Sequence, residues 1–193
     1  MSSQRPYHHG DLRRALVAEA LEVIASEGPN AVSLRALARR AGVSHAAPAH
    51  HFGDRAGLLT VIAVDGYRRL ADELDRATDL RDLGGRYVAF ALAHPAHFQV
   101  MFRPELLDGD DAELAAARAA TRERLARGVA AREAHEPEVG TLAAWSLAHG
   151  LATLLLTGNL PTLEGLDPRE VFHAVSHHPL LRLAPGEGTD APG

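Results

Sequence analysis

The spacing of apolar residues predicts a pair of short helices near the front of the chain. Between residues 34 and 41, leucine and alanine recur at i, i+3, i+4 and i+7, the pattern of one apolar helix face, and Ser33 is the expected N-cap. Gly42 suits a tight turn, and Ser44 is expected to cap a second helix that runs to Phe52. This is the helix-turn-helix pattern, whose second helix enters the major groove of DNA, although a corner that touches no nucleic acid shares it.

Longer helices are expected on both sides of this pair. One should run from Gly10 to about Gly28 and a second from its N-cap Asp54 to about Ala77. At 1.5 Å per residue the second would span roughly 30 Å and link two parts of the chain. The expected inner faces are Val17, Leu21 and Ile24 in the first helix, and Leu59, Ile62, Gly66, Leu70 and Leu74 in the second.

Every segment from Arg81 onward also has helical patterning, so the sequence predicts an all-α fold. His94-Pro95 should end one helix and start the next. Residues 110–135 are charged and alanine-rich, which favours a solvated helix with exposed side chains at Arg118, Arg122, Glu123, Arg124 and Arg127.

Residues 139–163 contain no Asp, Glu, Lys or Arg. Gly158 and Pro161 interrupt the segment, and its dense apolar part is too short to cross a membrane. We therefore expect a helix that is buried on one side by its own core and on the other by a partner subunit. A further helix should start at Asp167-Pro168 and end near His177, so that two copies of the chain could form a four-helix interface.

The charge distribution favours a nucleic-acid module at the front of the chain. The whole chain has a net charge of −5, but residues 1–60 hold seven arginines against five acidic residues. There is no cysteine, which excludes disulfides and thiolate metal sites, and the start lacks the apolar segment of a secretion signal. We expect a cytoplasmic protein.

Candidate chemistry in the second half comes from aromatic and histidine side chains. Phe98, Met101 and Phe102 form a stripe that is interpreted either as a pocket wall or as plain core. Twelve histidines invite a metal site, and His94 and His97 are three residues apart, but no His-Glu-x-x-His motif and no phosphate-binding glycine loop occur. We expect no enzymatic activity, no cofactor and no metal.

With these elements in place, the chain resembles the TetR family of transcriptional regulators across residues 10–65. The runs SLRALARRAGVS and HHFGDRAGLL carry the resemblance, and the Trp145-x-x-x-His149-Gly150 run with HPAHFQVMF is similar to one subgroup of ligand domains. The resemblance implies about nine helices, a homodimer formed by the last two long ones, and a small-molecule pocket in each C-terminal domain. The expected division is a helix-turn-helix domain at 1–53 with a flexible arm at 1–9, a connecting helix at 54–77, a ligand-binding and dimerisation domain at 78–183, and a disordered tail at 184–193.

Site residues follow from the patterns and the resemblance together. The expected DNA-binding residues are Arg5 in the arm and Ser33, Arg35, Ser44, His45, Ala46, Ala47, His50, His51 and Arg55. The expected ligand-binding residues are Tyr87, Phe90, His94, Phe98, Met101, Phe102, Trp145 and His149. The expected dimer-interface residues are Leu147, Leu151, Leu154, Leu155, Phe172 and Val175.

The function predicted from these residues is a ligand-responsive DNA-binding regulator. We expect a repressor that binds a near-palindromic operator as a homodimer and is released by a small, mostly apolar effector. Ala49 stands where the family usually has a phosphate-binding tyrosine, and Pro48 lies in the recognition helix. Two alternatives stay open: a dimeric small-molecule-binding protein with a degenerate DNA domain, and a histidine-based metal-binding protein or enzyme.

Overall fold

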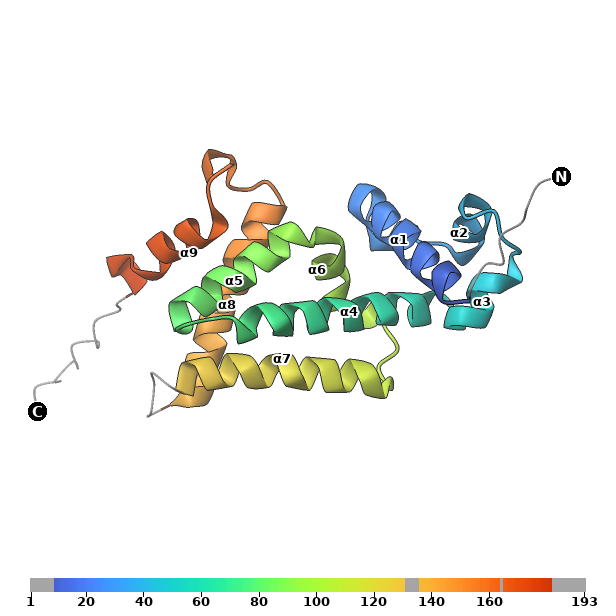
Figure 1. The fold of residues 1–193 in the computed structure, drawn as a ribbon. Helices are drawn as coiled ribbons and strands as arrows, with labels where there is room; N and C mark the ends of the chain where they lie inside the picture. The colour runs from blue at the N-terminus through green and yellow to red at the C-terminus, as the bar shows by residue number, and fades with distance from the viewer. Residues whose placement is uncertain (1–8, 131–135, 164, 182–193) are drawn as a thin grey trace, which may run out of the picture.

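The computed structural model describes residues 9–130, 136–163 and 165–181. Within these ranges it contains nine α-helices, four short 3₁₀ turns and no strand, which confirms the all-α prediction (Figure 1). The predicted arm with Arg5 and the predicted tail lie outside the described residues, apart from the end of the arm at residue 9, which is already helical.

Three helices form the N-terminal part of the molecule. They are α1 (His9–Glu27), α2 (Leu34–Arg40) and α3 (Ala46–Phe52), and a 3₁₀ turn at Pro29–Ala31 joins the first two. Of the predicted inner face of α1, Ile24 is fully buried, while Val17 and Leu21 are half-buried and pack against the edge of the core. The buried face lies one residue to the side and consists of Leu16, Ala20, Val23 and Ile24.

Helix α4 (Arg55–Asp75) runs from this part to the far end of the molecule (Figure 1). Its predicted N-cap is confirmed, since the Asp54 side chain accepts a hydrogen bond of 2.9 Å from the Gly57 amide. The helix ends two residues before the expected Ala77. All five residues of its predicted inner face are buried: Leu59, Ile62, Gly66, Leu70 and Leu74.

Helices α5 (Leu80–Ala93), α6 (Pro95–Met101) and α7 (Ala112–Ala130) pack around α4. The predicted break is confirmed, because His94 is the C-cap of α5 and Pro95 is the first residue of α6. The prediction that α7 is exposed to solvent is correct for only one side of the helix. Arg124 pairs with Asp75 of α4 at 2.8 Å, and α7 buries a stripe made of Leu114, Ala117, Thr121 and Val129.

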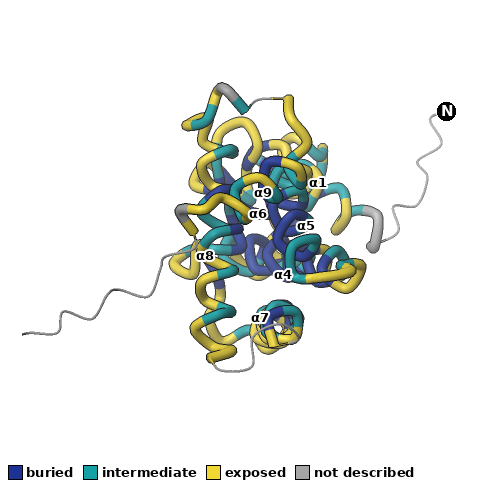
Figure 2. Tube along the Cα trace, turned by 90° about the vertical axis from the view of Figure 1, so that its left-hand side faces the viewer, coloured by how far each residue is buried: buried dark blue, intermediate teal, exposed yellow. Residues whose placement is uncertain are grey.

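The last two helices are α8 (Pro137–Leu156) and α9 (Pro168–Ser176). The predicted start of α9 is confirmed, since Asp167 caps it with a 2.8 Å hydrogen bond to the Arg169 amide. By length and composition alone α8 could cross a membrane, and only 17% of its most apolar window is buried in the single chain. Figure 2 shows that the outer side of α8 is exposed along much of the helix.

Candidate nucleic-acid interface and ligand cavity

The turn between α2 and α3 is built by the backbone around Gly42. The Val43 amide donates to the Ala38 carbonyl at 3.0 Å and the Gly42 amide donates to the Arg39 carbonyl at 3.3 Å. These two bonds form a Schellman motif, in which the residue after the helix adopts a left-handed conformation. Gly42 has a φ of 67°, so the predicted role of this glycine is confirmed.

Helix α3 presents its polar side to solvent. Pro48 and Phe52 are buried against the rest of the N-terminal part, and the guanidinium of Arg13 lies 5.6 Å from the Phe52 ring centroid. The opposite side is exposed, and Ala47 and His51 at its edges are half-buried. Of the predicted DNA-binding residues in and just before α3, Ser44, His45, Ala46 and His50 are exposed.

The predicted cap of α3 is wrong. The N-cap position is occupied by His45, not Ser44, and no side chain caps the helix. A capping side chain bonds the amide of the second or third helical residue, and the third residue of α3 is Pro48, which has no N–H. The Ala47 amide instead donates to the Ser44 carbonyl at 3.1 Å. Ser33 occupies the N-cap position of α2 but also makes no side-chain cap bond.

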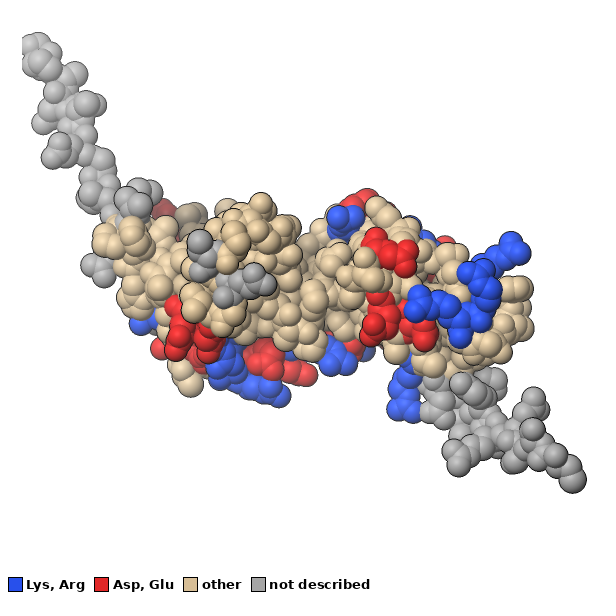
Figure 3. Space-filling model, turned by 90° about the horizontal axis from the view of Figure 1, so that it is seen from above, with Lys and Arg blue, Asp and Glu red and all other residues tan. Residues whose placement is uncertain are grey.

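The arginines near the motif have different roles. Arg35 is exposed on α2 and points away from the core, whereas Arg40 forms an ion pair of 2.9 Å with Glu19 of α1. The guanidinium of Arg55 donates to the Pro29 carbonyl at 2.9 Å, which ties the start of α4 to the α1–α2 connection. A contact of Arg55 with DNA stays a prediction. Figure 3 shows arginine side chains gathered at the end of the molecule formed by α1–α3.

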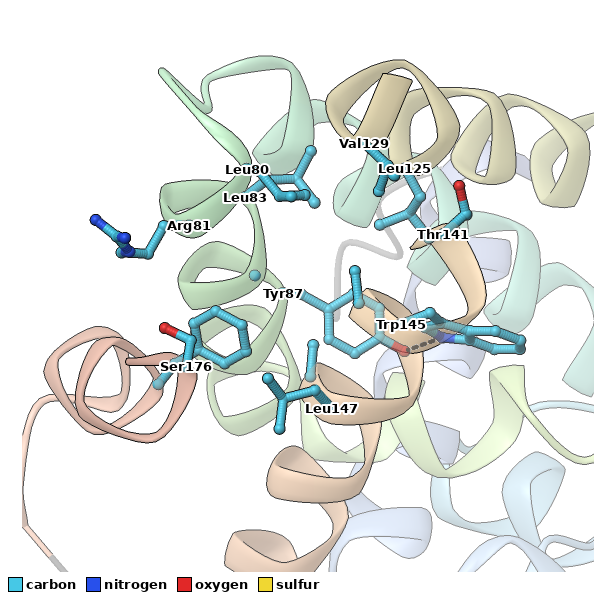
Figure 4. A pocket seen from close by; sticks show the side chains of 14 residues that line it. Leu80, Arg81, Leu83, Tyr87, Leu125, Val129, Thr141, Trp145, Leu147 and Ser176 are labelled. Carbon is cyan, nitrogen blue, oxygen red and sulfur yellow. Dashed lines mark hydrogen bonds between the residues drawn. The ribbon is translucent and has the colours of Figure 1, made fainter. Parts of the chain in front are cut away.

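A hydrogen-bonded aromatic cluster lies at the centre of the C-terminal part. The hydroxyl of Tyr87 accepts from Trp145 Nε1 at 3.1 Å and lies 2.9 Å from His149 Nδ1 (Figure 4 shows the first contact). Burial lowers the pKa of His149 and raises that of Tyr87, so both groups are neutral near pH 7. The tautomer of His149 decides which of these two groups donates the hydrogen bond between them. Phe98 stacks on His149 at 5.2 Å and Phe102 meets its ring edge-on at 4.6 Å.

Two cavities adjoin this cluster. One of about 190 Å³ lies between α5, α7, α8 and α9, and Figure 4 shows its largely apolar lining. The other, of about 470 Å³, lies between α4, α6, α7 and α8. Tyr87, Leu125, Thr141 and Trp145 line both cavities, so these side chains form the wall between them.

The predicted ligand-binding set is only partly brought together. Tyr87, Met101, Phe102 and Trp145 line the cavities, and Phe98 and His149 contact them from behind. Phe90 and His94 line neither cavity, so their role in ligand binding stays a prediction. The Phe90 ring is buried, and its centroid lies 5.1 Å from that of His94, the residue at which α5 ends.

Several cavity residues had no signal in the sequence. Tyr67 lies on α4, and its hydroxyl donates to the Met101 carbonyl at 2.7 Å. Leu125 and Arg118 lie on α7, which the sequence predicts to be a solvent-exposed helix, and Thr141 lies on α8. These side chains meet only because α4, α7 and α8 pack together.

The closest candidates for a metal site are His94, His97 and Asp65. His97 Nε2 lies 3.0 Å from an oxygen of Asp65, and its ring centroid is 5.7 Å from that of His94. Across the part of the chain that the structure describes, no three His, Asp or Glu side chains converge as a metal site would require.

Comparison with protein families identifies both halves of the chain. A family model described as "Bacterial regulatory proteins, tetR family" matches residues 16–62, and one described as "Tetracyclin repressor-like, C-terminal domain" matches residues 80–178. The chain belongs to the TetR family. The family match supports a DNA-binding transcriptional regulator.

Known proteins resemble this regulator over one or both halves. A protein of unknown function from Rhodococcus sp. RHA1 is 37% identical, with a TM-score of 0.74 over 90% of this chain and 95% of that one. The putative regulatory protein SCO4313 is 27% identical, with a TM-score of 0.70 over 89% and 96%. The HTH-type transcriptional regulator Rv1816 of Mycobacterium tuberculosis is 37% identical over 73 residues, which are 36% of this chain and 31% of that protein. The match thus spans about a third of the length of this relative.

Two residues of the predicted dimer interface are covered by the core of this TetR-family chain itself. Leu151 and Phe172 are 6% and 4% exposed within the single chain, and their place in an interface stays a prediction. Phe172 lies against Gly84 of α5, where the missing Cβ makes room for its ring. Leu147, Leu155 and Val175 are half-buried, and Leu154 is 44% exposed.

Proposed function

We propose that this TetR-family regulator is a homodimeric repressor of a near-palindromic operator and that a small effector releases it. The observation that carries the proposal is the orientation of α3. Its buried residues anchor the helix, while Ser44, His45, Ala46 and His50 face outward. Small exposed side chains let a helix backbone approach base edges in a groove about 12 Å wide. A cytoplasmic location follows from this role.

The outer side of α8 supports dimerisation. Between Glu138 and the end of the helix no charged residue occurs, and exposed apolar or small side chains recur with the helical period. They are Val139, Leu142, Ala143, Ser146, Thr153, Leu154 and Thr157. An exposed apolar patch of this kind marks an interaction surface. A twofold partner on this surface would place two α3 helices on one side of a duplex, roughly 34–36 Å apart.

Helix α4 supports the coupling between effector and DNA. Its start is tied to the N-terminal part through Arg55, and Tyr67 and Leu70 further along it line the larger cavity. An effector can shift the protein only by the difference of its affinities for two conformations. We propose that the effector prefers a conformation in which α4 is tilted and the α3 spacing no longer fits the operator.

The test of DNA binding uses duplexes selected from a random pool by the purified protein. Binding to a selected duplex and to a scrambled one is measured by gel shift over a range of salt concentrations. His45→Ala should reduce the ratio of the two affinities, because base contacts carry sequence specificity. Arg35→Ala should weaken both duplexes equally and reduce the salt slope by about 1 per subunit.

Arg127→Ala is the matched control, since this exposed arginine lies on α7, away from α3. It should leave both affinities unchanged. Recovery of no duplex from the pool would instead favour a small-molecule-binding protein with a degenerate DNA domain, an alternative supported by Ala49 on the exposed side of α3. Unchanged binding by both the His45 and Arg35 variants would contradict the assignment of α3.

A further inference from the structure

The larger cavity is bounded by two facing helical stripes. Each stripe has the spacing i, i+3, i+4 and i+7, so its four side chains lie on one face of their helix. The stripe of α7 consists of Arg118, Thr121, Arg122 and Leu125, and that of α8 of Glu138, Thr141, Leu142 and Trp145. The rest of the lining consists of Tyr67 and Leu70 of α4, Tyr87 of α5, and Met101, Phe102 and Pro104. The volume of about 470 Å³ lies in the range of small-molecule sites.

Two guanidinium groups stand one helical turn apart at this cavity. Among the described residues, neither Arg118 nor Arg122 has a carboxylate within ion-pair distance. Arg118 lies over the ring of Tyr67 at 5.8 Å from its centroid. By contrast Arg124, which points to another side of α7, is paired with Asp75 at 2.8 Å. Among the arginines of α7, the two without an acidic partner are thus those that line the cavity.

From this arrangement we propose that the effector is an organic monocarboxylate with an apolar body. Guanidinium groups bind carboxylates through paired, charge-assisted hydrogen bonds. Met101, Phe102 and Trp145 give the same cavity an apolar wall for the rest of the molecule. This inference rests on the proposed effector response and names the chemical class that the site takes.

The charge count favours a single negative charge over two. Arg118, Arg122 and Glu138 together leave one net positive charge at the cavity. A monocarboxylate neutralises that charge. A phosphate dianion would leave an excess negative charge in the same cavity as Glu138, and the repulsion between the two would weaken its binding.

The same contact connects the effector to α4. The Arg118 side chain that lies over Tyr67 is also one that a carboxylate would bind. Tyr67 is half-way along α4, and its hydroxyl holds the end of α6 through Met101. Movement of Arg118 toward a carboxylate would therefore remove a contact on the helix that carries the DNA-binding part.

Tryptophan fluorescence provides a direct test, because Trp145 is the single tryptophan of the chain and lines the cavity. The full-length protein is titrated at pH 8 with decanoate and with decan-1-ol, which share an apolar body and differ in the charged group. Decanoate should bind about ten-fold more tightly or better, the gain expected for hydrogen bonds to a charged group. Equal affinities would overturn the proposal.

Variants assign the preference to the two arginines. The double variant Arg118→Met, Arg122→Met should lose the preference for decanoate and keep the affinity for decan-1-ol, whereas Arg127→Met, the matched control, should keep both. Glu138→Gln should strengthen decanoate binding and also improve binding of decyl phosphate, which should be weaker than decanoate in the wild type. A preference that persists in the double variant, or a Glu138→Gln protein with unchanged decanoate affinity, would refute the site.

Operator binding is measured separately and without any carboxylate. Arg127→Met should bind the selected duplex like the wild type, whereas the double variant, which removes the contact of Arg118 with Tyr67, should bind it more weakly. Selective binding of decanoate by a protein that binds no duplex would refute the repressor proposal and leave the carboxylate site standing. Selective operator binding by a protein that shows no preference for decanoate would refute the carboxylate site and leave the repressor proposal standing.

Discussion

Replacement of Tyr87 by phenylalanine tests whether the aromatic cluster holds the C-terminal part together. Tyr87 is 1% exposed, so the ring stays buried in the variant and only the hydroxyl is lost. That hydroxyl bonds Trp145 Nε1 at 3.1 Å and His149 Nδ1 at 2.9 Å. Two hydrogen bonds with a net contribution of about 1 kcal/mol each give an expected loss of about 2 kcal/mol in the free energy of unfolding.

The assay is thermal and urea unfolding at one fixed protein concentration, because an oligomer's stability depends on concentration. For a chain of this length about 2 kcal/mol corresponds to a fall of roughly 4–8 °C in Tm. The matched control is Tyr67→Phe, which removes one buried hydroxyl bond, that of 2.7 Å to the Met101 carbonyl. It should cost about half as much. A Tyr87→Phe protein as stable as the wild type would show that these bonds contribute nothing to folding.

The pH dependence gives a second measure of the same cluster. Burial lowers the pKa of His149 from 6.5, so the unfolded chain takes up this proton first as the pH falls below 6.5. The contribution of His149 to stability is therefore present above that pH and is lost below it. A protonated Nδ1 also can no longer accept a hydrogen bond from the Tyr87 hydroxyl. Tyr87→Phe should consequently lose less stability between pH 7 and pH 5 than the wild type loses.

Two further variants test the packing of α4. Gly57→Ala would place a Cβ 2.0 Å from the backbone oxygen of Phe52. We expect the free energy of unfolding to fall by about 1–3 kcal/mol and operator binding to weaken. Gly109→Ala is the control, because no atom lies within 4 Å of its added Cβ, and it should change neither quantity. The hydrogen bond from His97 lowers the pKa of Asp65 from 3.8 to about 2. Ionised Asp65 therefore contributes about 1 kcal/mol, after solvent screening, to the free energy of unfolding above pH 4, and this contribution is lost as the pH falls toward 2. Acid titration of Asp65→Asn should lack that component, and equal acid profiles for variant and wild type would contradict the coupling.

Features set by a few neighbouring residues could be predicted from the sequence. Asp54 and Asp167 cap their helices because a carboxylate accepts amide bonds of the first turn wherever it precedes a helix. Pro95 starts a helix and Gly42 closes one for equally local reasons. The helix-turn-helix pair and the outward side of α3 followed from this local chemistry.

Features set by packing between distant helices could not be predicted in this way. Periodicity finds the apolar residues of a helix but not which of two adjacent stripes is buried, so Val17 was placed inward where Leu16 is. In a uniformly apolar helix such as α8, the apolar residues do not single out a buried face. Leu151 was therefore assigned to a partner, although the core of its own chain covers it. Because the sequence does not show which face of a helix meets which neighbour, Phe90 was predicted to line the cavity and Tyr67 was not.

The position of Tyr67 has a consequence for how signals cross the molecule. A helix of 21 residues is a stiff element, and α4 is fixed at its start by the bond from Arg55 to the Pro29 carbonyl. Its middle is fixed through Tyr67, which lies under Arg118 and bonds the end of α6. In the proposed mechanism, a ligand that removes the middle contact repositions α4 as a unit, because a packed core changes between discrete arrangements and does not deform continuously. The first turn of α4 would then move with it, and α3, joined to that turn through Gly53 and Asp54, would change its distance from the α3 of the proposed twofold partner.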